Sequence, residues 1–251
     1  MPMRTPRIFE PDLVEAGLTF NVTKSNAHYL TTVLRLSIGD NVVIFTGLGG
    51  EYLCEIIEVK KKFVRVEVRY FNPIERESDL RIHLGIGVSR GASMDFLVQK
   101  TTELGVSQVD VFCGIHSPKI FRTSEKNRHL KRWQRIASEA SKQCERQYPP
   151  EIYFHSDISA ALKTLPECPN SWILVTEPAD AISWKKITNS ADDLIKHHRV
   201  LIGPEGGFHQ DEIKISLHSG IRPVHLGPRI MRSETAAMSA VSILQFLWGD
   251  L

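Results

Sequence analysis

The strongest constraint on the fold is a pattern that occurs twice near the C-terminal end of the sequence. In each copy a short apolar run ends in glycine, an irregular loop follows, and a helix begins. The runs are residues 200–202 and 224–226, and the loops are residues 203–207 and 227–232. Strands that lead through loops into helices are typical of open α/β sheets, whose ligands lie at the carboxyl ends of the strands. We therefore expect a ligand cleft between these two loops.

Charged residues on the two loops favour a functional site over an ordinary turn. Proline and glycine at residues 204–207 could form a tight turn without any ligand, because they supply the required dihedral angles. The first loop, however, carries Glu205, and the second carries Arg229 and Arg232. The pairing of a carboxylate with two guanidinium groups predicts a site at these loops.

The helices that follow the loops have recognisable ends. Asp211 is the expected N-cap of the first helix, and Gly220 ends it. Ser233 or Thr235 is expected to cap the last helix, which extends to Trp248 and is apolar nearly all round. Such a helix should be buried, in part by a second subunit, because large exposed apolar patches usually mark an interface.

Short strands dominate the first third of the chain, whereas strands alternate with helices after residue 80. Tight turns between residues 19 and 72 suggest a small barrel or sandwich, and residues 71–79 are a credible linker. Strands expected at 80–88 and 106–113 flank a helix at 95–104, as in a parallel sheet. The stretch GIGVSRG at residues 85–91 lacks the GxGxxG spacing of a dinucleotide loop, so we discount an oxidoreductase site there.

A basic stretch at residues 119–146 is the main electrostatic feature. It holds nine Lys or Arg and three Glu, a net charge of +6. Residues 127–144 are expected to form one helix whose buried face contains Leu130, Trp133, Ile136, Ala137 and Ala140. The opposite face would then be basic, as expected of a phosphate-binding surface. A second basic group, at Lys60, Lys61 and Lys62, could equally be a solvated hairpin.

The motifs LIGPEGGF and LGPRIMRSETA, at residues 201–208 and 226–236, resemble the RsmE family. These are N3-uridine methyltransferases of small-subunit (16S) ribosomal RNA, of the SPOUT class. Met231 stands where the family usually has Leu, a change that conserves volume. The resemblance implies an α/β fold with helices on both faces of a parallel sheet and a C-terminal trefoil knot. It also implies S-adenosylmethionine as cofactor, the 30S subunit as substrate and a homodimer.

The resemblance further implies two domains and a set of functional residues. A PUA-like RNA-binding barrel would span residues 1–72, and a SPOUT methyltransferase domain residues 73–251. The cofactor contacts would be Thr176, Leu201, Ile202, Gly203, Pro204, Leu226, Gly227, Ile230, Met231, Arg232, Thr235 and Ala236. The RNA contacts expected from charge and resemblance are Arg4, Arg7, Arg35, Lys100, Arg122, Arg128, Lys131, Arg135 and Arg146.

Arg232 is the candidate that would stabilise negative charge on the uracil as its N3 proton leaves. The alternative is a structural clamp in which Arg232 pairs with Glu205 or Glu234. The sequence does not identify the general base, and both Glu205 and a water are candidates. A non-catalytic RNA-binding protein is the alternative function, and binding of S-adenosylmethionine distinguishes the two.

Composition adds exclusions. No apolar run approaches the ~20 residues needed to cross a bilayer. The four cysteines occur without CxxC or Cys/His pairing, so we expect free thiols in a reducing cytoplasm and no metal.

Overall fold

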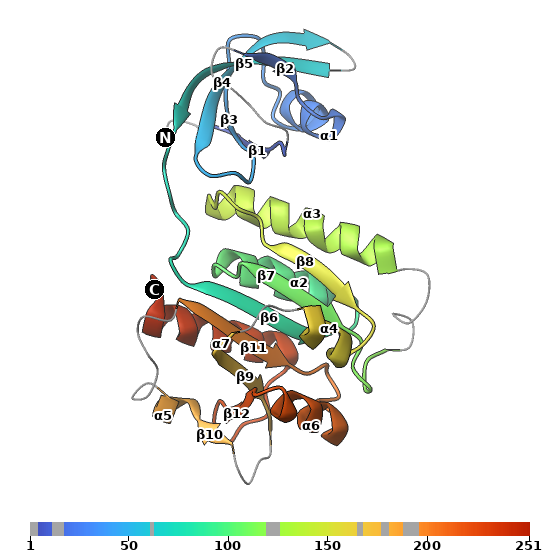
Figure 1. The fold of residues 1–251 in the computed structure, drawn as a ribbon. Coiled ribbons are helices and arrows are strands. Elements are labelled where there is room, and N and C mark those ends of the chain that lie inside the picture. The colour runs from blue at the N-terminus through green and yellow to red at the C-terminus, as the bar shows by residue number, and fades with distance from the viewer. Residues whose placement is uncertain are drawn as a thin grey trace. The chain divides into compact units, whose positions relative to one another are not determined.

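The computed structural model describes residues 5–11, 18–60, 63–118, 126–164, 168–176, 181–187 and 196–251. Contacts within the chain divide it into two compact units (Figure 1). Unit 1 comprises Met1–Glu77 and Ser141–Pro149, and unit 2 comprises Ser78–Ala140 and Pro150–Leu251. No helix among the described residues is long and apolar enough to span a membrane. All four cysteines are free thiols.

Unit 1 is built on a five-stranded sheet in the order β1-β3-β4-β5-β2. The strands are β1 (Arg7–Phe9), β2 (Thr19–Asn21), β3 (Asn41–Phe45), β4 (Glu51–Lys60) and β5 (Phe63–Asn72). β1 and β3 pair in parallel, and the other neighbours are antiparallel. One short helix, α1 (Lys24–His28), continues into a π-helical turn over Tyr29–Val33. Apolar side chains from these elements form a separate core.

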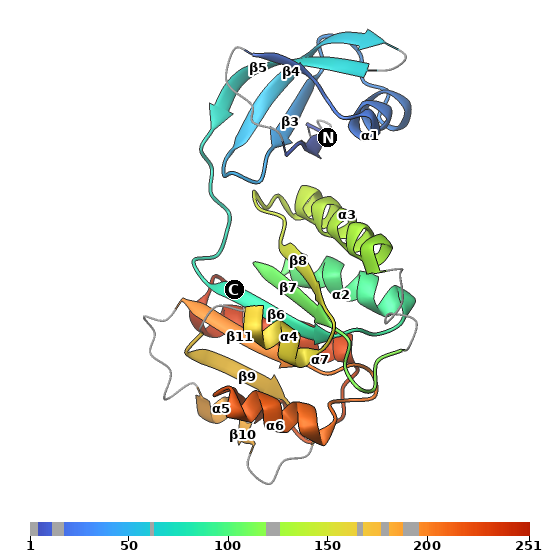
Figure 2. The ribbon, with the colours of Figure 1, turned by 45° about the vertical axis from the view of Figure 1, so that its right-hand side comes forward.

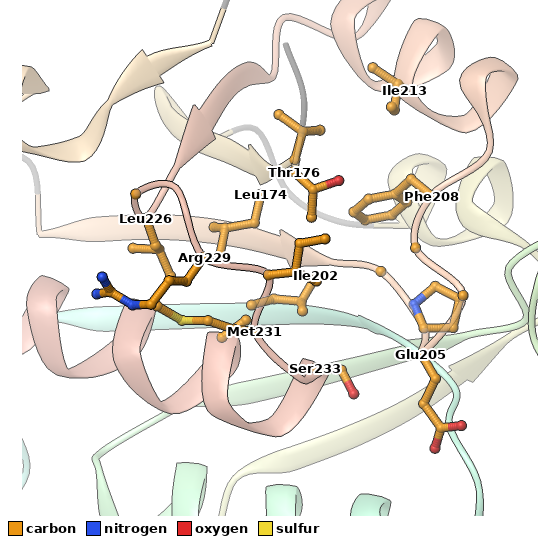
Figure 3. A pocket seen from close by; sticks show the side chains of 18 of the residues that line it. Leu174, Thr176, Ile202, Glu205, Phe208, Ile213, Leu226, Arg229, Met231 and Ser233 are labelled. Carbon is orange, nitrogen blue, oxygen red and sulfur yellow. The ribbon is translucent and has the colours of Figure 1, made fainter.

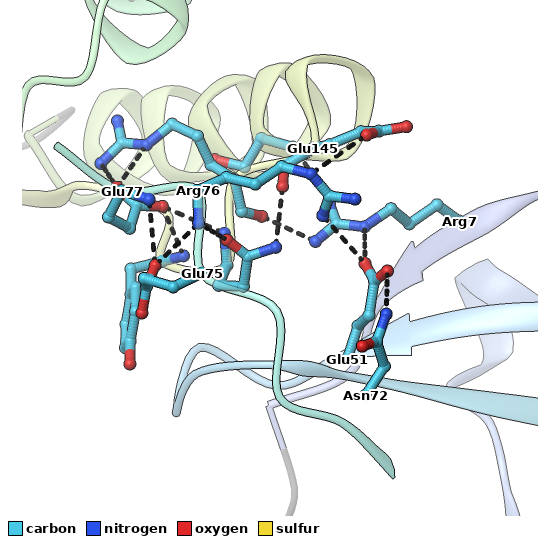
Figure 4. A network of polar contacts seen from close by, with 11 residues as sticks. Arg7, Glu51, Asn72, Glu75, Arg76, Glu77 and Glu145 are labelled. Carbon is cyan, nitrogen blue, oxygen red and sulfur yellow. Dashed lines mark hydrogen bonds and ion pairs between the residues drawn. The ribbon is translucent and has the colours of Figure 1, made fainter. Parts of the chain in front are cut away.

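The segment Ser141–Pro149 completes unit 1 through an arginine network (Figure 4). Arg7 donates from Nη1 to the Ser141 carbonyl at 2.9 Å and from Nη2 to the Arg146 carbonyl at 2.8 Å. The same guanidinium donates to Glu51. Arg146 in turn donates to Glu77, so one carbonyl in the last turn of α3, one just beyond it and the two arginines are satisfied together.

Unit 2 contains a seven-stranded parallel sheet in the order β10-β12-β9-β11-β6-β7-β8. The strands are β6 (Arg81–Gly87), β7 (Gln108–Phe112), β8 (Glu151–His155), β9 (Asn170–Leu174), β10 (Ile182–Ser183), β11 (His197–Ile202) and β12 (Arg222–His225). The expected parallel α/β domain is therefore confirmed.

Helices cover both faces of this sheet (Figure 2). The main core joins one face to α2 (Gly91–Glu103), α3 (Lys126–Cys144) and α7 (Ser233–Trp248). A second core joins the other face to α4 (Ile158–Thr164) and α6 (Gln210–His218), while α5 (Trp184–Ile187) follows β10. Trp133, Ala137 and Ala140 of α3 are buried as expected. Phe246 of α7 is 74% exposed, so one part of the last helix remains uncovered within this chain.

Two glycines of β6 allow the first loop to approach the sheet. A Cβ at Gly85 would collide with Leu201, and one at Gly87 would collide with Pro204. The stretch GIGVSRG therefore contributes close packing between β6, β11 and the loop at residues 203–207.

The expected helix caps are wrong at both loops. The N-cap of α6 is His209, and Asp211 lies in the first turn. His209 forms a capping box with Glu212, whose carboxylate accepts the His209 backbone N–H at 2.8 Å. Glu212 also accepts the Ile115 backbone N–H at 3.0 Å, which ties the loop after β7 to this helix. Arg232 is the N-cap of α7, which has no side-chain cap.

Candidate functional site

An apolar cavity of about 360 Å³ lies where β9, β11 and β12 end and α7 begins (Figure 3). Its walls combine apolar side chains, among them Ile202, Phe208 and Leu226, with the backbone of the two glycine loops. A cavity of this size and lining is typical of small-molecule sites. We refer to it as the apolar cavity.

Glycine shapes both loops of the apolar cavity. A Cβ at Gly203 would stand 3.0 Å from the Phe208 backbone nitrogen. Gly207 has φ +73° and donates its N–H to the Pro204 carbonyl at 2.8 Å, which closes the first loop as a turn. Gly227 has φ +117°, a conformation that side chains rarely adopt, although a Cβ there would meet no atom within 4 Å. The wall is therefore backbone that a ligand can approach closely.

Most of the residues predicted to contact a cofactor line this one cavity. They are Thr176, Ile202, Gly203, Pro204, Leu226, Gly227, Ile230, Met231 and Ala236. Leu201 points to the opposite face of the sheet, in the second core. Arg232 lines a different cavity, and Thr235 is exposed in the first turn of α7. The binding roles of these residues stay predictions.

Sequence reasoning missed other residues of the lining. Leu174 and Val175 lie at the end of β9, which is the neighbour of both β11 and β12. Phe208 precedes α6 and Ile213 lies within it, and Phe208 also stacks on Phe112 with ring centroids 6.2 Å apart. The apolar run at residues 172–175 does predict a strand, but it does not show which of its residues face the cavity. The inward direction of Phe208 depends on the fold.

A second, polar cavity of about 460 Å³ adjoins the apolar cavity. It is lined by Ser93, Glu205, Arg232, Ser233 and Glu234, so it shares Glu205 and Ser233 with the apolar cavity. In Figure 3 the Glu205 side chain points away from Leu226 and Phe208. We refer to this second space as the polar cavity.

The charged groups of the polar cavity do not pair with one another. No ion pair joins Arg232 to Glu205 or Glu234 in the part of the chain that the structure describes. Glu205 accepts a 3.4 Å hydrogen bond from the Arg90 backbone N–H. The arrangement does not show the clamp that was the alternative reading of Arg232, and it leaves the guanidinium available to a ligand.

The residues predicted to contact RNA fall into different environments. Arg35 is exposed in unit 1, and Arg128, Lys131 and Arg135 are exposed on α3. Lys100 pairs with Glu103 at 2.8 Å on α2. Arg7 and Arg146 are tied into the network of unit 1, an environment that favours a structural role. Arg4, Arg122, Lys61 and Lys62 lie outside the described residues.

Family comparisons agree with this geometry. Residues 76–245 match the family model described as an RNA methyltransferase domain. Residues 22–69 match the model described as an RNA methyltransferase PUA domain. The chain is 33% identical to the ribosomal RNA small subunit methyltransferase E of Buchnera aphidicola, over 98% of this chain and 95% of that protein.

Solved structures give the same result for the fold. A Legionella pneumophila protein, solved with the cofactor S-adenosylmethionine bound, has a TM-score of 0.90 and 32% identity over 99% of this chain and all of that one. The ribosomal RNA small subunit methyltransferase E of Neisseria gonorrhoeae, solved with S-adenosylmethionine, has a TM-score of 0.87 and 27% identity over the same shares. Among the described residues, no group of three or more His, Cys, Asp or Glu could hold a metal ion.

Proposed function

Because the chain belongs to the ribosomal RNA small subunit methyltransferase E family, we propose that it methylates N3 of a uridine in small-subunit ribosomal RNA. Its methyl donor is S-adenosylmethionine, as in the related structures solved with that cofactor. The observation that carries the proposal is the apolar cavity beside a polar cavity with an unpaired arginine. The first suits a cofactor and the second suits a polar base.

The residues present fit S-adenosylmethionine. The backbone at Gly203 and Gly227 can approach the cofactor closely, since neither residue places a side chain in the way. Leu226, Ile230 and Met231 offer apolar surface for an adenine ring. When bound, the cofactor supplies a methyl group that is activated by a positively charged sulfur. The protein then has mainly to align that group with the acceptor nitrogen.

Arg232 supplies the electrostatic part of the reaction. Uracil N3 becomes a good nucleophile only after it loses its proton, and the negative charge then spreads to O2 and O4. A guanidinium beside one of these oxygens stabilises the developing anion. Arg232 ends the second loop as the N-cap of α7 and lines the polar cavity, which supports a role beside the proposed cofactor site.

The RNA would be bound by unit 1 and by the outer face of α3. Arg128, Lys131 and Arg135 are exposed along that face and can contact phosphates without reading sequence. The PUA domain match at residues 22–69 supports RNA binding by unit 1.

A two-fold homodimer with a C-terminal knot also forms part of the proposal. Ile230 beside the apolar cavity is 83% exposed, and Phe246 on α7 is 74% exposed. A second copy that covered both would bury apolar surface next to each cofactor site. Sedimentation at the concentration of the activity assay measures the oligomeric state directly.

The proposed activity is tested by methyl incorporation into small subunits purified from a strain that lacks this gene. Digestion of the RNA to nucleosides and mass spectrometry should yield N3-methyluridine, with no incorporation into subunits from the parent strain. Equilibrium binding of S-adenosylmethionine separates the enzyme from a non-catalytic RNA-binding protein. A different methylated nucleoside would overturn the assignment of N3, and absence of cofactor binding would overturn the enzyme.

A further inference from the structure

The two carboxylates of the polar cavity differ in how firmly they are held. Glu234 accepts hydrogen bonds at Oε2 from the Ser93 hydroxyl at 2.9 Å and from the Ser233 hydroxyl at 3.3 Å. Its other oxygen, Oε1, makes no hydrogen bond within the described part of the chain. Among the described residues, Glu205 accepts only the 3.4 Å bond from the Arg90 backbone N–H, close to the limit for such a bond. Glu234 is therefore the oriented carboxylate with an acceptor to spare.

Glu234 also lies at the boundary between the two cavities. Ser233 lines both of them, and Glu234 and Arg232 are its neighbours in the chain. A nucleobase in the polar cavity would thus meet a carboxylate and a guanidinium, each next in the chain to a residue that lines the apolar cavity. This arrangement places the group that accepts a proton beside the group that stabilises the resulting charge.

The hydrogen-bonding edge of uracil matches these two groups. Uracil presents a donor at N3 between acceptors at O2 and O4, whereas cytosine presents an unprotonated N3. An ionised carboxylate only accepts hydrogen bonds and a guanidinium only donates them. Glu234 and Arg232, which line the same cavity, can therefore accept from N3–H and donate to a neighbouring carbonyl of uracil. Cytosine would place two acceptors, its N3 lone pair and the carboxylate, against each other.

We propose that Glu234 is the group that accepts the N3 proton of the target uracil, and that Ser93 and Ser233 hold it in position. This inference rests on the proposed function. The N3 proton passes to Oε1 of Glu234, and the electron pair of the N–H bond stays on N3. That pair forms the new bond to the methyl carbon while the carbon–sulfur bond of the donor breaks and its electrons remain on sulfur. The carboxylic acid afterwards returns its proton to water.

The kinetic test compares Glu234→Gln on RNA with uridine and with 5-fluorouridine at the target position. Loss of the proton acceptor should lower the turnover on uridine by about 100-fold or more. The loss should be smaller on 5-fluorouridine, because fluorine makes the N3 proton more acidic and less dependent on a base. Rescue of this kind would not occur if Glu234 only held the fold together.

A matched control is Glu151→Gln. Glu151 also accepts a hydroxyl hydrogen bond, from Tyr153 at 2.6 Å, but it is the first residue of β8, at the opposite edge of the parallel sheet. The turnover of the Glu151→Gln variant should equal that of the unmodified protein. Ser93→Ala should give a smaller loss than Glu234→Gln, again reduced on 5-fluorouridine, because it removes only one hydroxyl that positions the carboxylate.

A binding test needs no cofactor. Short single-stranded RNAs with uridine or cytidine at the target position are titrated into the cofactor-free protein. The unmodified protein should prefer uridine, and Glu234→Gln should shift the preference towards cytidine by about tenfold, because the amide can donate to cytosine N3.

The outcomes separate the two claims. If the unmodified protein forms no N3-methyluridine, the proposed function fails whatever the variants do. If it forms N3-methyluridine but Glu234→Gln keeps normal turnover and normal base preference, the inference about Glu234 is wrong. It is also wrong if Glu205→Gln, and not Glu234→Gln, shows the loss and the rescue by 5-fluorouridine. Should Glu234→Gln fail to fold, a Ser93→Ala variant without rescue overturns the inference by itself.

Discussion

Arginine and glutamate side chains gather in two regions of this protein, and the two gatherings behave differently. In unit 1 every charge of the network around Arg7 and Arg146 has a partner. Glu77, for example, accepts hydrogen bonds from Arg146 and from the backbone N–H groups of Gln147 and Tyr148. In unit 2 the charges of the polar cavity share a space of about 460 Å³ without pairing. The same residue types therefore stabilise a fold in one place and remain available to a ligand in the other.

The difference follows from the cost of removing charge from water. Arg146 is only 7% exposed at its side chain, and a buried cation must be compensated where it stands. Arg232 is exposed, so it needs no protein partner before a substrate arrives. Substitutions in the first region should change stability, and substitutions in the second should change the reaction.

The largest effect should come from Glu77→Ala. It leaves the Arg146 guanidinium buried without its carboxylate and two backbone N–H groups without their acceptor. The expected loss in the free energy of unfolding is about 3–5 kcal/mol, measured by chemical denaturation. The control is Glu67→Ala, which breaks a surface pair with Arg69 in the same unit and should cost less than about 1 kcal/mol. Equal losses in the two variants would show that the network is not structural.

Arg232→Ala should lower the turnover and leave the stability unchanged, the reverse of Glu77→Ala. Turnover should fall by about 100- to 1,000-fold, as when one donor to a developing anion is removed. The free energy of unfolding and the affinity for S-adenosylmethionine should stay unchanged, because the side chain makes no ion pair in the described part of the chain. Arg232→Lys should recover part of the turnover, since it keeps the charge but not the planar fork. Normal turnover in Arg232→Ala would remove this residue from the mechanism.

The contrast between Arg146 and Arg232 shows where sequence reasoning stops. Both were predicted functional residues, and nothing local distinguishes them. The partner of Arg146 is 69 positions away, and the carbonyl that Arg7 binds at the end of α3 is 134 positions away. Only the tertiary fold decides which cation is buried and paired.

The apolar cavity was more accessible to prediction because its cause is local. A strand that ends in glycine and continues through a loop into a helix can be recognised from consecutive residues. Two copies of this pattern predict a cleft between the two loops. The placement of Leu201 illustrates the limit: successive residues of a strand point to opposite faces, so Ile202 lines the cavity and Leu201 lies in the second core. The N-cap of α6 was mispredicted because histidine is an unusual N-cap, and that of α7 because Arg232 takes the position without a side-chain cap.

Gly227→Val tests whether the backbone of the second loop binds the cofactor. A branched side chain at φ +117° costs about 1–3 kcal/mol of strain, so the second loop should leave its conformation. The affinity for S-adenosylmethionine, measured by calorimetry, should fall by about 10- to 100-fold. The control is Gly39→Val in unit 1, where φ is +93° and a Cβ would also meet no atom within 4 Å. Tight cofactor binding by a folded Gly227→Val protein would contradict the placement.

Charge reversal on α3 tests a third arrangement, in which basic groups are exposed along a helix. Replacement of Arg128, Lys131 and Arg135 by Glu should weaken RNA binding at low salt and spare cofactor binding. If each side chain neutralises one phosphate, the slope of log affinity against log salt should fall by about 2–3. An unchanged slope would show that this face of α3 does not contact RNA.

The smallest effect at neutral pH should come from buried groups that lack partners and carry no charge there. Burial, together with the nearby His197, lowers the pKa of His83 from 6.5 to about 4, and Arg199 and Arg81 act in the same direction while Asp110 opposes them. Within the ranges that the structure describes, His83 Nδ1 has no hydrogen-bond partner, and the His83 and His197 rings stand 4.2 Å apart.

Because the pKa of His83 is lower in the folded state, the unfolded chain binds its proton first as the pH falls. Stability should therefore be fully present above about pH 6.5 and decline towards pH 4. His83→Leu should reduce the slope of the unfolding free energy against pH in this window. The exposed His28→Leu should leave that slope unchanged. An equal slope in all three proteins would mean that His83 accepts its proton while folded. Burial of His83 would then contribute nothing to the pH dependence of stability.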